Sequence, residues 1–594
     1  MYYDMWTCLL YLLKVYCAMD KLEFDFVIVG AGAAGCVLAN RLSALPHGPS
    51  VCLIERGPAH TDSRWNVAMA AAISYNKAYE NQRDLWLRYL SEPEKELNNR
   101  RIDCPRGVGW GGTTAVNGMV FVRGQPQDFD RWATHEYCSQ LWSYEKCLPY
   151  FKRLESYTPG FDLEHAIDVE AEVGCMKTHS QYRGFDGPIK VSSGRYTNQN
   201  YSKCPYFPEF IRAGIQAGHK YNPDYNGIVQ EGIGWMDANI SGGLRQTSSR
   251  CYLLPAISRS NLIVISESVV CRVILEEKRA VGVEYIGSKG EKRIVNATKE
   301  VILSGGAYNS PQLLMLSGIG DPAELRKAGI EPLHELPGVG RNLMDHLHFP
   351  LMYATRHPEF SFAPGDWKTT NTWANRMRAQ WECNRDGQGA SNHIEACHFF
   401  KTNELQTTAN MECALMSSKV DVYPDGNFYF NSGMSVLLIN ERPPSIGRLA
   451  LRSKTPTDDP LIEQNYFSDP KEIREFVDAI HIVRKVFAQP ALAEYIGEEL
   501  LPGPNFPNIE QFIRMASTSC FHPCGTCRMG DPDAAPTPEV AHQLVVDAEL
   551  RVCGLRGLRV VDASVMPSIT SGNINAPTLM IAERAADFIA STIY

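Results

Sequence analysis

The chain has 594 residues, and its 44% hydrophobic and 21% charged content is typical of a folded protein with more than one lobe. Because the net charge is −9 and no run of lysine or arginine occurs, we expect no nucleic-acid partner. Eighteen cysteines in so long a chain are too sparse for a disulfide scaffold.

Residues 1–22 predict an N-terminal extension outside the fold. Residues 5–19 are apolar, but Lys14 interrupts them and they are too short for an ordinary membrane-spanning helix. Asp4 stands where a signal peptide carries positive charge, and an arginine-rich mitochondrial presequence is absent. The extension is expected to associate with a membrane or to be poorly ordered.

Residues 24–29 form a short apolar run that predicts a strand buried on both faces of a parallel sheet. Gly30, Gly32 and Gly35 follow with GxGxxG spacing. In that motif the first glycine permits a tight turn, the second lets a pyrophosphate approach the backbone, and the third lets a helix pack closely on the strand.

The segment after these glycines completes the dinucleotide-binding pattern. Ala33–Ser43 has helical character, so its N-terminus presents free N–H groups and a positive dipole end to phosphates. A second apolar strand, Val51–Ile54, ends at Glu55, which lies 20 residues after Gly35. An acid at this position accepts hydrogen bonds from ribose hydroxyls. The stretch therefore predicts dinucleotide binding.

Residues 99–124 contain a glycine-rich loop that could lie flat against a planar or phosphorylated ligand. Trp110 and the apolar residues 119–122 favour a loop buried at a ligand over a surface loop. Further on, residues 261–286 predict two strands joined by a polar turn at residues 276–279. Residues 301–320 predict a buried strand, a turn at Gly305 and Gly306, and a helix that begins near Ser310.

Two short motifs suggest metal chemistry, but neither is complete. His346 and His348 share one face of a strand, yet no cysteine or carboxylate cluster accompanies them, so we expect no metal there. Cys524 and Cys527 form a CxxC pair without a second pair, and we interpret it as incidental.

Residues 358–440 are rich in Asn, Pro and aromatic residues and predict an irregular segment that covers a substrate. Glu395 lies there in an apolar and aromatic neighbourhood, and a buried carboxylate needs a partner. The residues alone leave two partners open, a cationic ligand or an ordinary salt bridge.

The C-terminal region places His522 before a rigid turn, in FHPCGTCRMG. Residues 560–587 then predict a buried strand, a Gly- and Asn-rich loop, and a helix that begins at about Pro577. A helix N-terminus reached from a polar loop can hold an anionic or electron-rich group.

The motifs together resemble those of the glucose-methanol-choline (GMC) oxidoreductases, and within them the choline dehydrogenase branch. The matching stretches are CPRGVGWGG, EGIGWMDANI, GASNHIEACHFF, FHPCGTCRMG and VVDASVMPSITSGNINAPTLMIAERAAD. The resemblance implies an α/β fold with a Rossmann-like FAD-binding lobe, intertwined with an α+β substrate lobe built on an antiparallel sheet. It divides the chain into an FAD-binding region at 23–345, with a substrate-lobe segment at about 150–255, a second substrate-lobe segment at 346–441, and a C-terminal region at 442–588 that carries the catalytic residues.

The resemblance also implies the reaction and its residues. Choline would be oxidised to betaine aldehyde, as in glycine betaine synthesis, by hydride transfer to flavin N5, with a quinone-type electron acceptor. His522 would take the hydroxyl proton, Asn573 would hydrogen-bond the same oxygen, and Glu395 would neutralise the trimethylammonium group. The positions implied in FAD binding are Gly30, Gly32, Gly35, Glu55, Gly111, Gly112, Thr113, Asn117, Gly118, Val270, Asp562, Ala563, Asn573, Pro577 and Thr578.

Some members of the family attach FAD covalently through a histidine, but Val116 stands at that position and has no nucleophile. We therefore expect non-covalent FAD. Animal relatives imply the mitochondrial inner membrane and peripheral membrane association, with the cytoplasm as the alternative because no clear presequence is present.

Two stretches depart from the choline dehydrogenase pattern, residues 428–444 and residues 396–399 after Glu395, and both could alter the substrate pocket. Two other functions therefore stay open. One is a GMC oxidase or dehydrogenase of another primary alcohol. The other is a flavin-binding interaction protein without activity, against which the presence of both His522 and Asn573 counts.

Overall fold

The computed structural model describes residues 23–60, 65–72, 85–134, 138–160, 166–363, 367–422, 428–503 and 506–593. The predicted extension at residues 1–22 lies outside them. Two seven-stranded sheets, each with its own apolar core, organise the described residues. The predicted fold class, a Rossmann-like lobe joined to a lobe built on an antiparallel sheet, is confirmed.

The first sheet has the strand order β10-β2-β1-β13-β12-β11, with β26 also paired to β13. β10, β2, β1, β13 and β26 pair in parallel, and β12 and β11 extend the sheet by antiparallel pairing. Its central strands are buried on both faces, which explains their continuous apolar sequences. The strands are β1 (Glu23–Val29), β2 (Val51–Ile54), β10 (Leu262–Ile265), β11 (Val269–Glu276), β12 (Arg279–Ile286), β13 (Lys292–Leu303) and β26 (Leu558–Val560).

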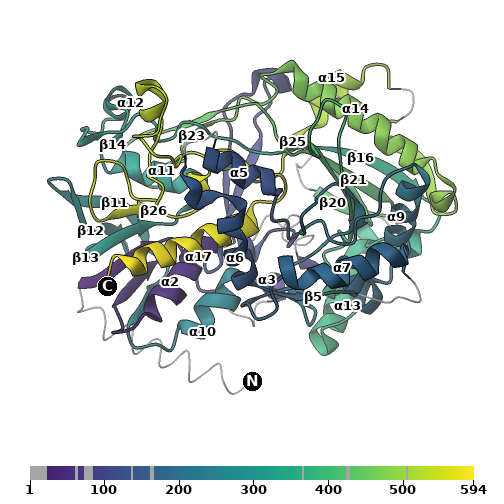
Figure 1. Cartoon of the computed structure of the whole chain (residues 1–594), viewed down its shortest axis with the longest axis horizontal. Helices are drawn as coiled ribbons and strands as arrows, with labels where there is room; N and C mark the ends of the chain where they lie inside the picture. Colours follow the sequence, from purple (N-terminus) through teal and green to yellow (C-terminus); the bar gives the residue numbers. More distant parts are fainter. Residues whose placement is uncertain are drawn as a thin grey trace.

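Helices from both ends of the chain cover this sheet. α2 (Ala33–Ser43) follows the glycine-rich turn, and α17 (Asn575–Ser591) packs along it, as Figure 1 shows. Arg41 on α2 forms an ion pair with the fully buried Glu583 on α17 at 2.7 Å. α11 (Gly306–Leu316) follows β13. The N-terminal dinucleotide motif and the C-terminal helix therefore belong to one lobe.

The second sheet is antiparallel, with the order β24-β16-β21-β18-β17-β7 and β25 paired to β16. Helices α9 and α14 pack against it, and α14 and α15 lie over it at the upper right of Figure 1. Phe349 of β16 contacts Phe476 of α14 and Phe512 of α15 edge to face. The elements are β7 (Gly232–Trp235), β16 (Leu347–Thr355), β17 (Ala396–Phe400), β18 (Met411–Met416), β21 (Met434–Asn440), β24 (Ile496–Leu501), β25 (Thr518–Ser519), α9 (Tyr206–Gln216), α14 (Pro470–Phe487) and α15 (Ile509–Ala516).

The other elements connect or cover these two layers. The remaining helices are α3 (Trp65–Ala68), α5 (Pro126–Thr134), α6 (Tyr144–Leu154), α7 (Val169–Tyr182), α8 (Gly194–Thr197), α10 (Leu254–Ala256), α12 (Pro322–Lys327), α13 (Trp367–Asn384) and α16 (Pro538–Ala541). The paired short strands are β3 (Trp86–Leu90) with β4 (Asp103–Gly107), β5 (Glu155–Thr158) with β6 (Ile189–Ser192), β8 (Ile240–Ser241) with β9 (Leu244–Arg245), β14 (Ile319–Gly320) with β15 (His334–Glu335), β19 (Lys419–Val422) with β20 (Phe428–Asn431), and β22 (Arg448–Ala450) with β23 (Leu461–Glu463).

Three local predictions need correction. Residues 358–440 are not irregular, because they contain α13 and five strands. Residues 261–286 form three strands rather than two, since β10 precedes the predicted hairpin of β11 and β12. α11 begins at Gly306, earlier than predicted, because the Asp562 carboxylate accepts hydrogen bonds from the Gly306 N–H and the Ser310 hydroxyl at the start of the helix.

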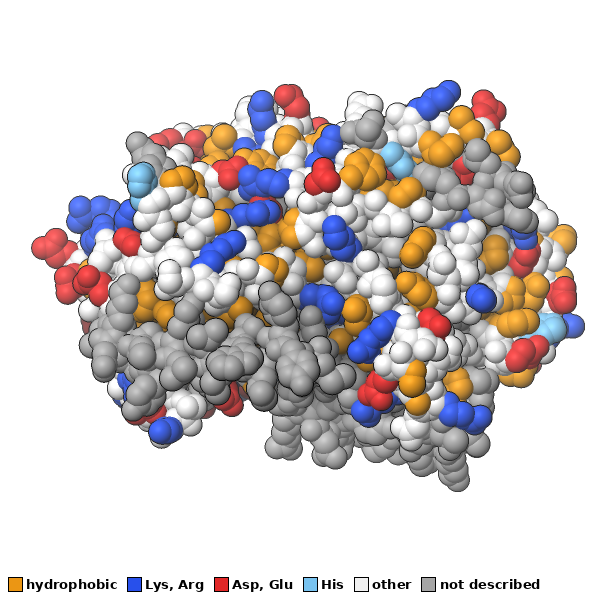
Figure 2. All heavy atoms as spheres, turned by 90° about the horizontal axis from the view of Figure 1, so that it is seen from below, with side chains coloured by type: hydrophobic (Ala, Val, Ile, Leu, Met, Phe, Trp, Pro, Cys, Tyr) orange, Lys and Arg blue, Asp and Glu red, His pale blue; other side chains and the backbone are white. Residues whose placement is uncertain are grey.

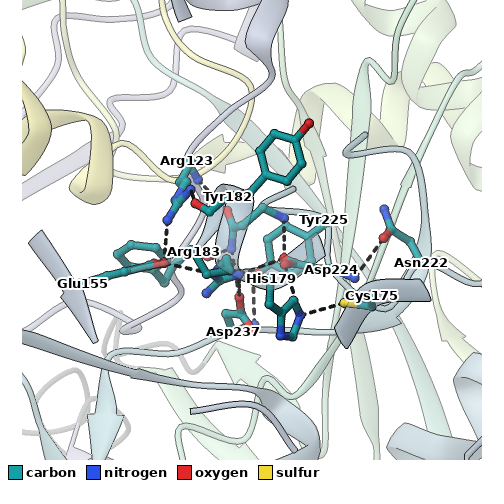
Figure 3. Close-up of polar contacts among 12 residues, drawn as sticks. Arg123, Glu155, Cys175, His179, Tyr182, Arg183, Asn222, Asp224, Tyr225 and Asp237 are labelled. Carbon is teal, nitrogen blue, oxygen red and sulfur yellow. Dashed lines mark hydrogen bonds and ion pairs between the residues drawn. The ribbon is translucent and has the colours of Figure 1, made fainter. Parts of the chain in front are cut away.

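A buried network of charges connects segments between residues 123 and 237 (Figure 3). The Arg183 guanidinium contacts Glu155 at 3.0 Å and both Asp224 and Asp237 at 2.8 Å, and Glu155 also pairs with Arg123. Arg183 is fully buried. Buried carboxylates are stable only with such partners, so this arginine compensates three acids at once.

Beside this network Cys175, His179 and Asp224 bring three potential metal-ligand atoms within 4.8 Å of one another, a cluster that the sequence analysis did not single out. The Cys175 Sγ lies 2.7 Å from the His179 Nε2, a hydrogen-bond distance. Two ligands of one tetrahedral zinc would lie about 3.5 Å apart. In this arrangement the three groups therefore form a hydrogen-bonded extension of the Arg183 network.

The surface in Figure 2 mixes acidic and basic side chains over the coloured part of that face, and hydrophobic side chains lie between them in small groups. Within the described residues, no helix is both long and apolar enough to cross a membrane.

The Arg183 network generates a stability prediction. We expect Arg183→Met to lower the free energy of unfolding by about 3–5 kcal/mol, because it leaves buried carboxylates without their cation. Arg212→Met is the control, since its ion pair with Glu209 is half exposed and is worth less than about 1 kcal/mol. Denaturant unfolding of both variants measures the difference, and equal midpoints would contradict a compensating role for Arg183.

Candidate functional site

One cavity of about 370 Å³ connects the two lobes. Its volume falls within the range of roughly 300–1,000 Å³ that is usual for small-molecule and cofactor sites. It runs from the glycine-rich turn after β1 to the face of the antiparallel sheet that carries His348 and Ile439, and His522 and Asn573 line it as well. The structure thus brings the predicted dinucleotide motif and the predicted catalytic residues to one place.

The glycines at the first end have the steric roles predicted from their spacing. A Cβ atom on Gly35 would lie 1.8 Å from the Gly30 carbonyl oxygen, so α2 can approach β1 only with glycine there. A Cβ on Gly32 would meet nothing within 4 Å. Space is therefore left at the N-terminus of α2, where backbone N–H groups favour a phosphate.

Glu55 lines the cavity, but much of its hydrogen-bonding capacity is used by the protein. Its Oε2 accepts from the Ala31 N–H at 2.8 Å, and its Oε1 accepts from the N–H groups of Gly57 and Gly109. Burial raises the pKa of the carboxyl group, and these three bonds oppose that rise. Because each carboxylate oxygen can accept two hydrogen bonds, Oε2 retains capacity for a ribose hydroxyl.

The loop at residues 107–118 lies directly on the glycine-rich turn. The Gly111 N–H donates to the Ala31 carbonyl at 2.8 Å, and a Cβ on Gly112 would lie 2.8 Å from the Gly32 Cα. Asn117 accepts hydrogen bonds from Arg245 and from the Met119 N–H. The predicted burial of this loop is confirmed.

Most of the residues predicted to bind the cofactor line the cavity, whereas Gly35, Gly111 and Pro577 do not. Gly35 and Gly111 instead fix the backbone next to it. The predicted residues that line the cavity are Gly30, Gly32, Glu55, Gly112, Thr113, Asn117, Gly118, Val270, Asp562, Ala563, Asn573 and Thr578. Their individual roles toward a cofactor stay predictions.

The backbone around His522 is held from both lobes. The buried Asp345 accepts the His522 N–H at 2.7 Å and the hydroxyls of Ser519 and Tyr466. On the other side, Gly525 and Cys527 donate their N–H groups to the carbonyls of residues 563 and 564. Cys524 and Cys527 are buried free thiols within this backbone pairing.

Hydrogen bonds fix the tautomer of His522. The His346 Nε2 lies 3.1 Å from the Glu441 carbonyl oxygen, which can only accept, so Nε2 carries the proton and Nδ1 of neutral His346 is an acceptor. The His522 Nδ1, at 3.0 Å from that atom, must then donate. The Nε2 of neutral His522 is left with a lone pair, which accepts from the Asn573 Nδ2 at 3.2 Å.

Electrostatics keep this chain of side chains neutral. Burial lowers the pKa of His346 to about 4. Burial, followed by repulsion from the positive charge that His346, Arg106 and His348 carry when protonated, lowers the pKa of His522 well below 6.5. Asn573 has its Oδ1 buried without a hydrogen-bond partner among the described residues. The site therefore presents an unprotonated imidazole nitrogen and an amide, both lining the cavity, as a proton acceptor next to a hydrogen-bonding group.

Glu395 lies elsewhere. Its side chain is buried but is not part of the cavity wall. The carboxylate accepts from the Ser391 and Ser202 hydroxyls at 2.6 Å and from the Asn198 amide at 2.9 Å, and burial raises its pKa to about 7. The structure does not bring it together with His522, so a cation-binding role for Glu395 stays a prediction without support from this geometry.

Sequence reasoning missed three residues of the site. His346 was noted only in a metal motif that was set aside, Asp345 beside it was not singled out, and Glu412 drew no attention because nothing in its neighbourhood marks it. Glu412, Ile439 and His348 stand opposite one another on β18, β21 and β16, and all line the cavity. The sequence did offer one signal for Asp345, an acidic residue directly before His346.

Comparison with known families decides the assignment. The model of the GMC oxidoreductase N-terminal region matches residues 24–348, and that of the C-terminal region matches residues 443–582. The chain belongs to the GMC oxidoreductases. It is an FAD-dependent alcohol oxidoreductase.

Among this GMC oxidoreductase's relatives, an oxygen-dependent choline dehydrogenase of Vibrio vulnificus is 39% identical over 96% of this chain and 94% of its own length. A mitochondrial choline dehydrogenase of Homo sapiens is 39% identical over 96% and 90%. Among solved structures, pyridoxine 4-oxidase from Mesorbium loti has a TM-score of 0.78 at 28% identity over 95% of this chain and 98% of that one. A formate oxidase from Aspergillus oryzae, studied for FAD modification, shares the fold with a TM-score of 0.81 at 23% identity over 96% and 99%.

The residues of this GMC oxidoreductase fit FAD. The open space at Gly32 suits a pyrophosphate, Glu55 can hold a ribose, and the cavity continues from there to His522 and Asn573, where a flavin ring would meet an alcohol. When bound, FAD supplies the hydride acceptor.

Two glycine variants separate folding from FAD binding. We expect Gly35→Ala to prevent correct folding, because its Cβ collides with backbone. Gly32→Ala should fold normally yet bind FAD much more weakly, because the added methyl group fills the phosphate approach. Circular dichroism and FAD titration measure the two effects. Gly174→Ala, an exposed helical position with open space, is the control and should change neither. Tight FAD binding by Gly32→Ala would contradict this view of the site.

Proposed function

We propose that the protein oxidises choline to betaine aldehyde, with FAD as hydride acceptor and a quinone-type compound as the final electron acceptor, in glycine betaine synthesis. The observation that carries the proposal is the neutral His522 with its Nε2 lone pair in the cavity next to Asn573. The choline dehydrogenase relatives support the choice of substrate.

The chemistry of the residues follows from their hydrogen bonds. An alcohol hydroxyl can donate to the His522 Nε2 while the Asn573 Nδ2 turns to donate to the same oxygen. His522 takes the proton as the carbon–hydrogen bond is broken, and Asn573 stabilises the oxygen on which negative charge develops. The His346 Nδ1 accepts a hydrogen bond from the His522 Nδ1–H. The proton of His522 therefore stays on Nδ1, and the His522 Nε2 is free to accept the hydroxyl proton.

A second candidate is the oxidation of a primary alcohol other than choline. Leu437 and Ile439, which belong to the stretch at 428–444 that departs from the choline dehydrogenase pattern, line the cavity. Ala414 and Ile394 also line it, so this wall is largely apolar. A neutral alcohol with an apolar chain would fit such a wall.

For the setting of the reaction, we propose the mitochondrion, by analogy with the mitochondrial relative, and peripheral attachment to the inner membrane, as the family resemblance implies. The oxygen-dependent bacterial relatives make oxygen the alternative acceptor and the cytoplasm the alternative compartment. Re-oxidation of the substrate-reduced protein by oxygen or by a soluble quinone, after anaerobic mixing with choline, distinguishes the two acceptors.

The base role of His522 can be tested by substitution. We expect His522→Ala to slow flavin reduction by an alcohol by on the order of 10²–10⁴-fold with FAD still bound, because the proton acceptor is lost. Stopped-flow absorbance measures the rate, and His542→Ala, an exposed histidine, is the control. Wild-type rates in His522→Ala would refute the assignment.

The pH dependence is a further prediction. For a neutral alcohol, kcat/KM should stay constant as the pH falls through 6.5, because the pKa of His522 lies well below that value.

Attachment of the flavin is a separate prediction. Val116 and Asn117 line the cavity next to each other, and neither offers a nucleophile. We expect acid precipitation to leave all flavin in the supernatant, with recovery calibrated by FAD added to apoprotein. Flavin that pellets with the protein would show a covalent bond.

A further inference from the structure

Two buried carboxyl groups in the substrate lobe are not used by the base mechanism. Glu412 on β18 is 1% exposed and lines the cavity, and Glu441, just after β21, is fully buried. Their carboxyl groups hydrogen-bond to each other. Apart from this bond, the Glu412 Oε2 and both Glu441 oxygens have no partner within the part of the chain that the structure describes.

This pair differs from the other buried acids of the site. Asp345, Asp562 and Glu55 each accept backbone N–H or hydroxyl hydrogen bonds, and Glu395 accepts three from neutral groups. Each of those carboxylates is therefore satisfied by the protein. A buried carboxylate without donors costs several kcal/mol, so the pair calls for a positively charged or donating partner from outside the described residues.

The sheet places the pair across the cavity from the base. His348, Ile439 and Glu412 stand side by side on β16, β21 and β18, so their side chains share the face that lines the cavity. Two strand spacings, about 10 Å, separate His348 from Glu412. His348 is close enough to His522 to lower the pKa of His522. Because His522, His348 and Glu412 all line this cavity, one ligand in it can contact both His522 and Glu412.

We propose that Glu412, supported by Glu441, binds the cationic group of the substrate, an ammonium or quaternary ammonium on the same molecule as the hydroxyl that His522 deprotonates. This inference rests on the proposed function and makes it more specific. It assigns the charge recognition that the sequence analysis gave to Glu395 to a different glutamate.

The protonation of the pair supports this role. Burial raises the pKa of Glu412 to about 7, and burial together with the Glu412 charge raises that of Glu441 well above its ordinary value. Glu441 therefore keeps the shared proton and donates it, while Glu412 carries one negative charge above about pH 7. The charged or titratable groups that face the pair are Asp128 of α5, Arg442 after β21, Cys397 of β17, Cys413 of β18 and His348 of β16.

The experiment compares choline with 3,3-dimethyl-1-butanol, its neutral isostere, in wild type, Glu412→Gln, Glu395→Gln and Glu472→Gln. We expect Glu412→Gln to raise the KM for choline at least tenfold and to leave that for the neutral alcohol within about twofold, since only choline loses a charge partner. Glu472 is the matched control, because it is buried with a raised pKa but does not line the cavity, and its variant should behave as wild type. A choline-specific loss in Glu395→Gln but not in Glu412→Gln would overturn the proposal.

Two further measurements keep the test decisive if Glu412→Gln does not fold. In wild type, the KM for choline should rise about tenfold per unit as the pH falls below 7, while that for the neutral alcohol stays flat. Binding of tetramethylammonium, measured by calorimetry without turnover, should show the same pH dependence. A pH-independent affinity for both compounds would overturn the proposal. Wild type that oxidises other alcohols but not choline would refute the proposed function, and tetramethylammonium binding would still test the cation site.

Discussion

Backbone hydrogen bonds between β13 and β26 join the middle of this chain to its C-terminal part. Val301 pairs with Leu558 and Leu303 with Val560, so residues more than 250 positions apart run side by side. The parallel pairing delivers the loop after β26 to the edge of the sheet where the glycine-rich turn also opens. Asn573 and His522 reach the dinucleotide motif only because this late strand completes the first sheet, in keeping with the rule that ligands bind at the carboxyl ends of parallel strands.

Charge in the interior is handled in three ways. In the Arg183 network, buried acids are paired with a buried cation. Where the protein needs rigid backbone, as at Glu55, Asp345 and Asp562, a carboxylate collects N–H and hydroxyl donors from separate segments and binds them together. Such acids are structural clamps rather than free charges. Where the protein faces a ligand, at Glu412, the donors are missing. The same residue type thus acts as a clamp or as a recognition group according to which donors surround it.

Much of the first lobe was predictable because its signals are local. Ala33–Ser43 and Val51–Ile54 occur with the predicted bounds, since a strand, a glycine-rich turn and a helix follow directly in sequence. The second lobe was not predictable in this way. β17, β18 and β21 are buried on both faces, so their residues do not alternate, and α13 carries no clear apolar stripe.

The candidate site shows the same division. His522 and Asn573 could be named from the family motifs that contain them, whereas their hydrogen bond, the tautomer set by His346 and the clamp at Asp345 depend on contacts between segments far apart in sequence. Glu395 was selected because a motif drew attention to it, and Glu412 was overlooked because no motif includes it. Which of two glutamates faces a cavity is decided by strand pairing, which a single sequence does not encode locally.

The attachment of His522 to both lobes has a mechanical consequence. On one side, β25 pairs with β16 of the antiparallel sheet, and on the other, residues 525 and 527 hydrogen-bond to the segment that follows β26. His522 is therefore held between two attachments, one in each lobe. Any shift of one lobe against the other would pull on the backbone that carries His522, so the distance between the proton acceptor and Asn573 depends on both lobes keeping their register.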